Sequence, residues 1–319
     1  MATCDGAYGD MKAFGVAFLG VCLLVCGCRK AVEFYLANEL KPVTERDLVE
    51  MSEHDLDRVD IARMNLICAL AAFQRKGPEL EECLKQVDAW ADRVKSSEER
   101  YRKTFERNPA RYDNSYAKFR AVNLVLTIKE DFRCRYQRTL IDSGAMNEIH
   151  SPRFFLNPDD VFITGLLRHR RGTCASYPVL IAALGRRLGY PIYLKMNYGH
   201  LFCHWDDGRE QFNIDTNGDG VDTPPDEYYF SNPIYGLNGR SKVQLANDRV
   251  MVKLYNWDVL GVFLETAGCS LEAQGALPGA QGHYRAALKY RPNCQNLQRL
   301  AARRIRIVPL PDRTKCQEQ

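Results

Sequence analysis

Three side chains that suit thiol chemistry lie close together in the sequence: Cys174, His200 and Asp215. A thiol nucleophile needs a base that takes its proton and a carboxylate that orients and charge-stabilises the base. The stretch from Arg171 to Asp215 supplies one residue of each type. We therefore expect a catalytic triad, provided that the fold brings these three residues together.

Cys174 precedes a helical pattern, and Gly189 followed by Tyr190-Pro191 is a typical helix end. At the amino terminus of a helix, unpaired N–H groups and the helix dipole stabilise a thiolate. Pro178 cannot donate a hydrogen bond to the carbonyl of Cys174, so we expect a kinked first turn or a regular helix that begins near Ser176. The apolar positions of the pattern are Val179, Leu180, Ala183, Leu184 and Leu188.

Two alternating runs joined by Asp206-Asp207-Gly208-Arg209 predict a β-hairpin. A two-residue turn at Asp207-Gly208, or a four-residue loop from Asp206 to Arg209, pairs His200 directly with Asp215. Directly opposed residues have Cβ atoms roughly 5 Å apart, close enough for an aspartate to hold an imidazole. A loop of odd length would separate the two residues. The opposite face is apolar and is expected to pack in the core: Leu201, Cys203, Trp205, Phe212 and Ile214.

The motifs around these residues resemble those of the transglutaminase-like superfamily: Gly-Thr-Cys at a helix start, Gly-His opening a strand, and Asn-Ile-Asp ending the next strand. The preceding PRFFLNPDDVFITGLLRHRRGTC and the following GRRLGYPIYL are similar to its bacterial SirB-type branch. The resemblance covers residues 114–229. It implies a papain-like α+β core, with Cys174 as nucleophile, His200 as general base and then acid, and Asp215 as orienting carboxylate.

Plainer interpretations stay open for individual residues. A single cysteine among twelve is often a small buried hydrophobic residue. His204 lies on the same predicted strand face as His200, but the expected register pairs it with Gln211. We interpret His204 as a satisfied surface or supporting histidine rather than as the base.

The amino terminus predicts export. An apolar run from Phe14 to Val25 has the length of a signal peptide, and Val25-Cys26-Gly27-Cys28 resembles a bacterial lipobox. We expect residues 1–28 to be a lipoprotein-type signal peptide whose true start is Met11. Lipidation of Cys28 would tether the protein to a membrane of the bacterial cell envelope, on its periplasmic or extracellular face. An uncleaved anchor and an ordinary secretory signal are the alternatives.

Composition argues against a nucleic-acid binder. The 319 residues include 44 Lys and Arg and 40 Asp and Glu, so the net charge is only +4. No cofactor or metal motif is expected, because the remaining cysteines show neither a CxxC pair nor metal-ligand spacing with histidine. Some of them are able to form disulfides after export, although their odd number leaves at least one free if Cys174 is a thiol. They are Cys68, Cys83, Cys134, Cys203, Cys269, Cys294 and Cys316.

Helical patterns flank the expected core of residues 114–254. A helical amino-terminal region of residues 29–113 leads into it, and the predicted helices are Asp47–Gln74, Glu79–Arg107 and Ser115–Arg135. Residues 142–158 are expected to form a loop that borders a substrate cleft. Residues 255–319 are expected to be helical and to contain one tetratricopeptide-like repeat that packs on the core or on a further half-repeat; two arbitrary helices are the alternative. The repeat positions are Leu264, Gly268, Ala280, Tyr284, Ala287 and Pro292.

The segment from Asp215 to Asp226 also fits much of a calcium-binding loop of EF-hand type. Pro224-Pro225 obstruct the helix that should leave such a loop, and calcium would take Asp215 away from His200. We favour a Gly-rich turn that solvates its own backbone.

Together these patterns predict an exported, membrane-tethered thiol hydrolase or acyltransferase that acts on peptide or other amide bonds. Its expected partners are a peptide or protein and the membrane, without nucleic acid. The main alternative is a non-catalytic scaffold of the same fold that uses its helical ends to bind a partner.

Overall fold

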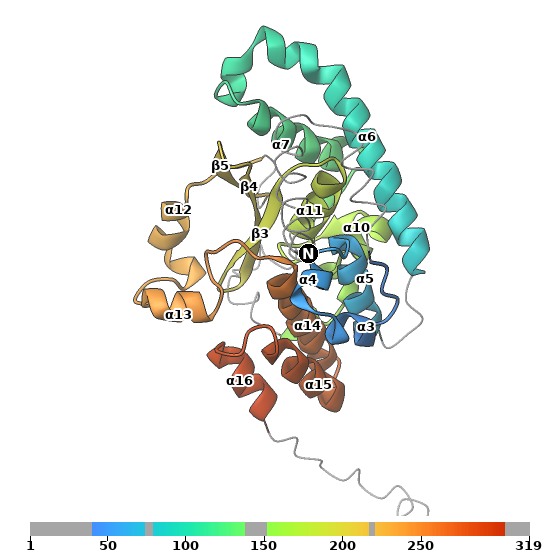
Figure 1. The fold of residues 1–319 in the computed structure, drawn as a ribbon, viewed down its shortest axis with the longest axis vertical. Helices are drawn as coiled ribbons and strands as arrows, with labels where there is room; N and C mark the ends of the chain where they lie inside the picture. The colour runs from blue at the N-terminus through green and yellow to red at the C-terminus, as the bar shows by residue number, and fades with distance from the viewer. Residues whose placement is uncertain (1–39, 74–78, 138–151, 217–220, 304–319) are drawn as a thin grey trace, which may run out of the picture.

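The computed structural model describes residues 40–73, 79–137, 152–216 and 221–303 (Figure 1). The predicted signal peptide of residues 1–28, the alternative start at Met11 and the lipidation site Cys28 lie outside the described residues, and so does Cys316. Across the described residues the chain is mixed α and β, with many helices around one small antiparallel sheet.

The first predicted helix, Asp47–Gln74, is divided into shorter helices. The Ser52 hydroxyl accepts a hydrogen bond from Asp55 N at 3.2 Å, and the Asp60 carboxylate accepts one from Arg63 N at 2.9 Å. Each of these side chains caps a new helix, so the single-helix prediction was wrong here. The resulting helices are α3 (Glu45–Glu50), α4 (Glu53–Leu56) and α5 (Ile61–Ala72).

The second and third predicted helices agree better with the structure. Helix α6 (Leu80–Arg107) matches the predicted range Glu79–Arg107, buries one apolar stripe and ends before Pro109. Helix α7 (Tyr116–Leu126) continues as a π-helical turn (Thr127–Asp131) and stops short of the predicted end at Arg135, because Arg133 has a φ of +55°. A short 3₁₀-helix joins α6 to α7 (Pro109–Tyr112).

A three-stranded antiparallel sheet lies at the centre of the molecule, with strand order β3-β4-β5. Helix α11 packs on β3 and β4, and α6 and α10 lie on the far side of α11 from the sheet (Figure 1). A separate two-stranded parallel pair joins Tyr136 to Gly172 just before Cys174. The elements of this part are β1 (Arg135–Tyr136), α8 (Pro152–Phe155), α9 (Pro158–Val161), α10 (Ile163–His169), β2 (Arg171–Gly172), α11 (Tyr177–Arg187), β3 (Ile192–Asn197), β4 (His200–Asp206) and β5 (Gln211–Ile214).

The two faces of the sheet pack against different partners. The face with Leu201, Cys203 and Trp205 belongs to the main core, as the sequence predicts. The other face is covered by an irregular segment that forms a second apolar cluster around Phe202 and Tyr229. This covering segment contains α12 (Asp226–Ser231), a 3₁₀-turn (Pro233–Tyr235) and α13 (Lys242–Asn247).

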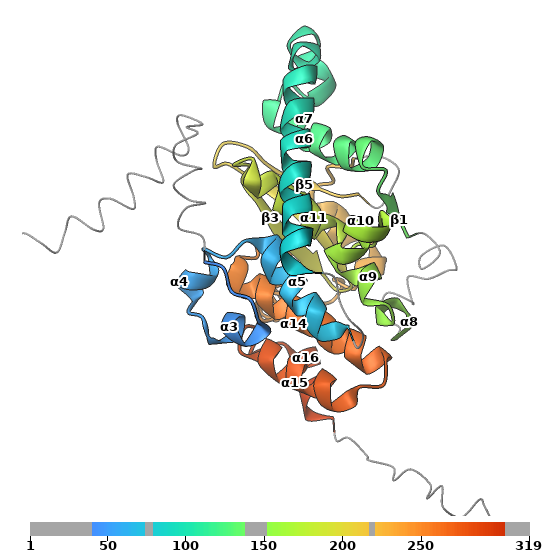
Figure 2. The same ribbon diagram turned by 90° about the vertical axis from the view of Figure 1, so that its right-hand side faces the viewer.

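The carboxyl-terminal helices form a compact end of the molecule (Figures 1 and 2). Gly268 lies in close contact with Tyr284: a Cβ at Gly268 would fall 2.6 Å from the Tyr284 ring, so glycine allows the two helices to approach. The helices are α14 (Asn256–Ala273), α15 (Leu277–Leu288) and α16 (Gln295–Ala302). Helix α14 packs on α5 of the amino-terminal region and on α8 of the expected core, and α15 packs on a third helix; the tetratricopeptide-like assignment itself stays a prediction.

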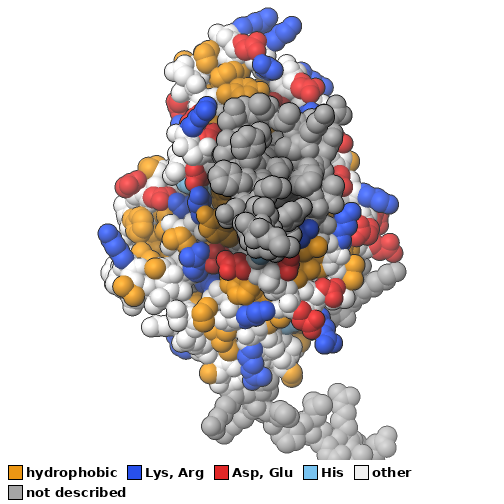
Figure 3. Space-filling model, viewed as in Figure 1, with side chains coloured by type: hydrophobic (Ala, Val, Ile, Leu, Met, Phe, Trp, Pro, Cys, Tyr) orange, Lys and Arg blue, Asp and Glu red, His pale blue; other side chains and the backbone are white. Residues whose placement is uncertain are grey.

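One continuous apolar core joins elements of the three sequence regions, residues 29–113, 114–254 and 255–319. On the face shown in Figure 3, basic and acidic side chains are interspersed among the described residues. Within the described ranges, no helix combines the length and apolar character needed to cross a membrane.

The carboxyl end of α11 is tied to the amino-terminal helices by Arg187. Its guanidinium donates to both carboxylate oxygens of Asp60, at 2.6 and 3.0 Å, and to Asp88 at 2.7 Å. The side chains of Arg187 and Asp60 are each only 13% exposed, whereas Asp88 is 64% exposed.

We expect Arg187→Met to lower the free energy of unfolding by about 3 kcal/mol, because it leaves a largely buried carboxylate without its cation. Asp88→Asn, which removes only the exposed partner, should cost less than about 1 kcal/mol. Urea unfolding of both variants measures the difference. Equal losses in the two variants would contradict the assignment of Arg187–Asp60 as the stabilising pair.

Candidate active site

A closed turn before α11 holds Cys174. The Thr173 hydroxyl donates to Asp160 O at 2.8 Å and accepts from Ala175 N at 3.2 Å. The Ser176 hydroxyl accepts from Thr173 N at 3.0 Å and donates to Asp160 O at 3.2 Å. Both hydroxyl-bearing residues are fully buried, so the backbone around the thiol is fixed on both sides.

The helix itself begins at Tyr177, one residue after Ser176, which confirms the expectation drawn from Pro178. Gly172 is required by close packing, because a Cβ there would lie 2.7 Å from the Ser176 hydroxyl oxygen. Cys174 is 5% exposed, and its sulfur lies 4.0 Å from Gly199 O, at the turn that leads into His200.

His200 and Asp215 form a buried pair. The distance from His200 Nε2 to Asp215 Oδ2 is 2.9 Å, and the two side chains are 4% and 6% exposed. Burial lowers the pKa of His200, but the charge and hydrogen bond of Asp215, together with Cys174, outweigh it and raise the pKa to about 10. Burial raises the pKa of Asp215, but His200, Tyr229 and the Thr216 N–H bring it below its usual value.

This geometry assigns the two ring nitrogens of His200. Asp215 occupies Nε2, so Nδ1 is the nitrogen that remains for the Cys174 side chain, whose hydrogen bond helps to raise the pKa of His200. A protonated imidazole beside a sulfur is the arrangement in which a thiolate–imidazolium pair forms. The structure therefore brings the three predicted residues together.

The predicted hairpin register was wrong by two residues. Strand β4 pairs Trp205 with Phe212 and Asp206 with Gln211. The loop is Asp207–Glu210, because the Asp207 carboxylate accepts from both Arg209 N and Glu210 N at 2.8 Å.

Continuing this register places Asp215 opposite Phe202, so His200 and Asp215 are diagonal rather than direct neighbours. A shift of two residues preserves the side of the sheet on which each residue lies, and diagonal neighbours remain within reach of an imidazole.

The other candidate residues of the hairpin have structural partners. His204 pairs with Asn213 rather than with Gln211, and its Nδ1 lies 2.9 Å from Asn213 Oδ1. Burial lowers the pKa of His204, so its interactions fit a supporting histidine.

In the segment considered for calcium, Asp215 holds His200, and Asp226 accepts hydrogen bonds from Lys195 at 2.8 and 2.9 Å. Residues 217–220 lie outside the described residues. Within the described part of the chain, no group of three His, Cys, Asp or Glu side chains is arranged to hold a metal ion.

Two tyrosines that the sequence analysis did not single out contact the triad. The Tyr229 hydroxyl donates to Asp215 Oδ2 at 2.8 Å. Tyr136 lies on β1 beside Gly172. Burial and, to a smaller extent, the Cys174 side chain raise the pKa of the Tyr136 hydroxyl, which also accepts a hydrogen bond from the Cys174 backbone N–H. The sequence signal for Tyr229 was its place in the Asp226-Glu227-Tyr228-Tyr229 stretch after the hairpin, whereas no local pattern pointed to Tyr136.

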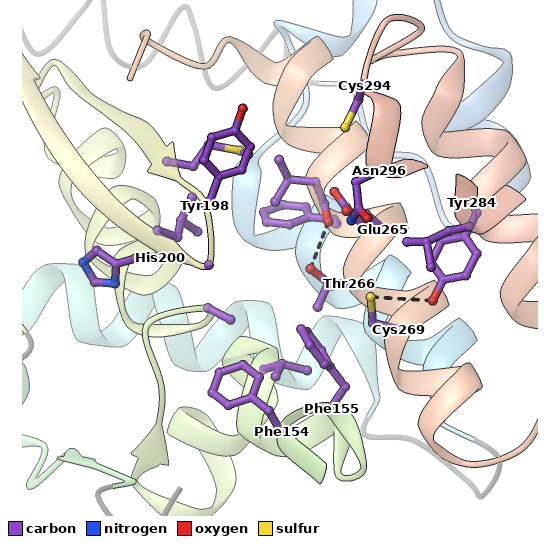
Figure 4. A pocket seen from close by; sticks show the side chains of 18 of the residues that line it. Phe154, Phe155, Tyr198, His200, Glu265, Thr266, Cys269, Tyr284, Cys294 and Asn296 are labelled. Carbon is purple, nitrogen blue, oxygen red and sulfur yellow. Dashed lines mark hydrogen bonds between the residues drawn. The ribbon is translucent and has the colours of Figure 1, made fainter. Parts of the chain in front are cut away.

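A cavity of about 620 Å³ opens beside Cys174 and His200 (Figure 4). Phe154 and Phe155 line it, so the predicted cleft-bordering segment does reach the site, although α8 and α9 replace part of the expected loop. Its opposite wall is formed by α14, α15 and α16. The seven cysteines in the described ranges are all free thiols: Cys68, Cys83, Cys134, Cys174, Cys203, Cys269 and Cys294.

The raised pKa of His200 predicts how stability depends on pH. A group whose pKa is higher in the folded state contributes its stabilisation fully below its unfolded value, about 6.5, and loses it as the pH rises through the folded value, here about 10. We expect Asp215→Asn to lower the free energy of unfolding by about 3 kcal/mol at pH 6, and by progressively less toward pH 10.

Urea unfolding of both proteins at pH 6, 8 and 9.5 checks this expectation. Asp131→Asn, which breaks a partly exposed pair with Arg93, serves as the control and should cost less than about 1 kcal/mol at each pH. A loss in Asp215→Asn that stays constant or grows with pH would show that His200 is not held protonated by Asp215.

Comparisons of the chain with protein-family models, with curated proteins and with solved structures found no match. The resemblance to the transglutaminase-like superfamily thus stays a prediction based on the sequence motifs.

Proposed function

We propose that this chain is a thiol hydrolase or acyltransferase that acts on peptide or other amide bonds through Cys174, His200 and Asp215. The observation that carries the proposal is the buried His200–Asp215 pair, 2.9 Å apart, next to a cysteine at a helix start. A structural histidine in the core has no need of a charged partner and a thiol at once. The transglutaminase-like, papain-like arrangement belongs to the same proposal, supported by α11 packing on the β3-β4-β5 sheet.

The chemistry follows from the assigned atoms. The Cys174 thiolate attacks the amide carbonyl carbon and forms the C–S bond, while the carbonyl oxygen takes the negative charge. In this proposal the donors to the oxyanion are the Cys174 N–H and the Tyr136 hydroxyl, which interact with each other beside the sulfur and would turn toward the substrate oxygen. His200 passes its proton to the departing nitrogen, the C–N bond breaks, and a thioester remains on Cys174.

The second half of the reaction regenerates the Cys174 thiolate. Water gives a proton to His200 and attacks the thioester, which releases the carboxylic acid and the Cys174 thiolate; an amine in place of water gives transfer. Asp215 stays ionised throughout and keeps Nε2 of His200 oriented. We favour hydrolysis, because water is abundant.

Export and a lipid anchor at Cys28 are part of the proposal, based on the amino-terminal sequence alone. They place the site on the periplasmic or extracellular side of the bacterial envelope, where a peptide or protein is the expected substrate.

We expect Cys174 to be alkylated by iodoacetamide at pH 6 at least about tenfold faster in the wild type than in His200→Ala, because the imidazolium stabilises the reacting thiolate. Mass spectrometry of the labelled peptide, with Cys174→Ala as the blank, gives the rate. His204→Ala is the matched control from the same strand face and should leave the rate within about twofold. Equal rates in the wild type and His200→Ala would favour the non-catalytic scaffold.

A further inference from the structure

The cavity beside Cys174 extends away from the triad into the carboxyl-terminal helices. Figure 4 shows His200 and Tyr198 at one side, and Glu265, Thr266 and Cys269 of α14 at the other. The space between them belongs to both the sheet region and the helical end. A molecule that is bound to the thiol and fills this cavity would therefore contact α14 as well.

One wall of the cavity is aromatic. Phe154 and Phe155 pack edge to face with ring centroids 5.0 Å apart, and both line the cavity (Figure 4). Val262 and Phe263 of α14 add further apolar surface. Ligand pockets with such a lining favour apolar side chains, because burying an apolar side chain away from water stabilises the complex.

The Glu and Arg side chains that line the cavity are paired with each other. Arg291 forms an ion pair with Glu265, and Arg303 lies 2.6 Å from Glu272, which also accepts a hydrogen bond from the Tyr284 hydroxyl at 2.6 Å. A charged group on a ligand would thus compete with an existing pair. The lining favours an uncharged ligand.

Asn197 supplies an unused polar group. It lines the cavity, is 1% exposed, and neither its side-chain nitrogen nor its oxygen has a hydrogen-bond partner within the described chain. Asn197 is the direct cross-strand partner of His200 across the Tyr198-Gly199 turn, so the two side chains leave the same face of the sheet. The Asn carboxamide has both a donor and an acceptor, so it can accept a hydrogen bond from the N–H of a peptide unit and donate one to its C=O.

We propose that this cavity is the subsite for an uncharged peptide segment, whose aromatic or large aliphatic side chain packs against Phe154 and Phe155 and whose peptide unit hydrogen-bonds Asn197. This inference rests on the proposed thiol chemistry. The expected substrates are therefore uncharged peptide segments with an aromatic or large aliphatic side chain.

The first experiment measures alkylation of Cys174 in the full chain by N-chloroacetyl-phenylalanine amide, N-chloroacetyl-glutamic acid amide and chloroacetamide. In the wild type, the phenylalanine reagent should react at least about tenfold faster than the glutamate reagent. Thr266→Phe fills the cavity from α14 and should slow the phenylalanine reagent about tenfold while leaving chloroacetamide unchanged. Thr266→Ser is the matched control and should change neither rate.

The outcomes separate the two proposals. Equal rates for the phenylalanine and glutamate reagents, or equal slowing of all three reagents in Thr266→Phe, overturn the subsite while the thiol chemistry stands. A chloroacetamide rate that does not depend on His200 overturns the proposed function and, with it, the subsite.

The second experiment tests Asn197 through stability and selectivity together. Asn197→Leu should leave the free energy of unfolding unchanged or raise it, because it replaces a buried polar group without partners by an apolar one of similar size. It should also reduce the preference for N-chloroacetyl-phenylalanine amide over its methyl ester, which keeps the chloroacetyl N–H but lacks the carboxyl-terminal carboxamide N–H, from about tenfold to about one.

Thr164→Val is the control for the second experiment. It removes a buried hydroxyl that, like the Asn197 carboxamide, has no partner among the described residues, but Thr164 does not line the cavity. It should leave the amide-to-ester ratio unchanged. A marked loss of stability or of soluble protein in Asn197→Leu, or an unchanged ratio, shows that Asn197 serves the fold and overturns its assignment to the ligand.

Discussion

A charged imidazole–carboxylate pair is stable inside a protein only when its remaining hydrogen-bonding capacity is used, because two ions have been taken out of water. Asp215 meets this condition by accepting from His200, from the Tyr229 hydroxyl and from Thr216 N at 2.7 Å. Tyr229 belongs to the segment that covers one face of the sheet. The irregular stretch containing α12 and α13 is therefore part of the candidate site, since it excludes water from the pair and supplies one of its donors.

The position of Cys174 depends on a second constraint, which is the position of α11. At one end of this helix, the Thr173 and Ser176 hydroxyls bind Asp160 O and fix the turn that carries Cys174. At the other end, Arg187 binds Asp60 of the amino-terminal region. Both ends of the helix are thus tied to neighbouring elements, and the amino-terminal helices act as a frame for the nucleophile.

How much of this was predictable depends on whether the signal is local. Pro178 fixed the start of the helix, and alternation identified the strands, because both effects act within a few residues. The hairpin register was missed because hydrogen bonds from Arg209 N and Glu210 N to the Asp207 carboxylate set the position of the loop. The alternation of apolar and polar residues does not reveal these bonds. The contact between Tyr136 and Cys174 depends on the parallel pairing of β1 with β2, which no local pattern in the sequence specifies.

The position of α14 bears on whether the helical end is a separate binding module. Gly268 lets α15 approach closely, and α14 in turn packs on α5 and α8. This packing directs Glu265 and Thr266 into the same cavity as Cys174 and His200. A scaffold that bound a partner through its helical end alone would not require that end to share a cavity with a cysteine and a histidine that is paired with an aspartate. The shared cavity is explained more directly if the carboxyl-terminal helices form a wall of the site in which the thiol reacts.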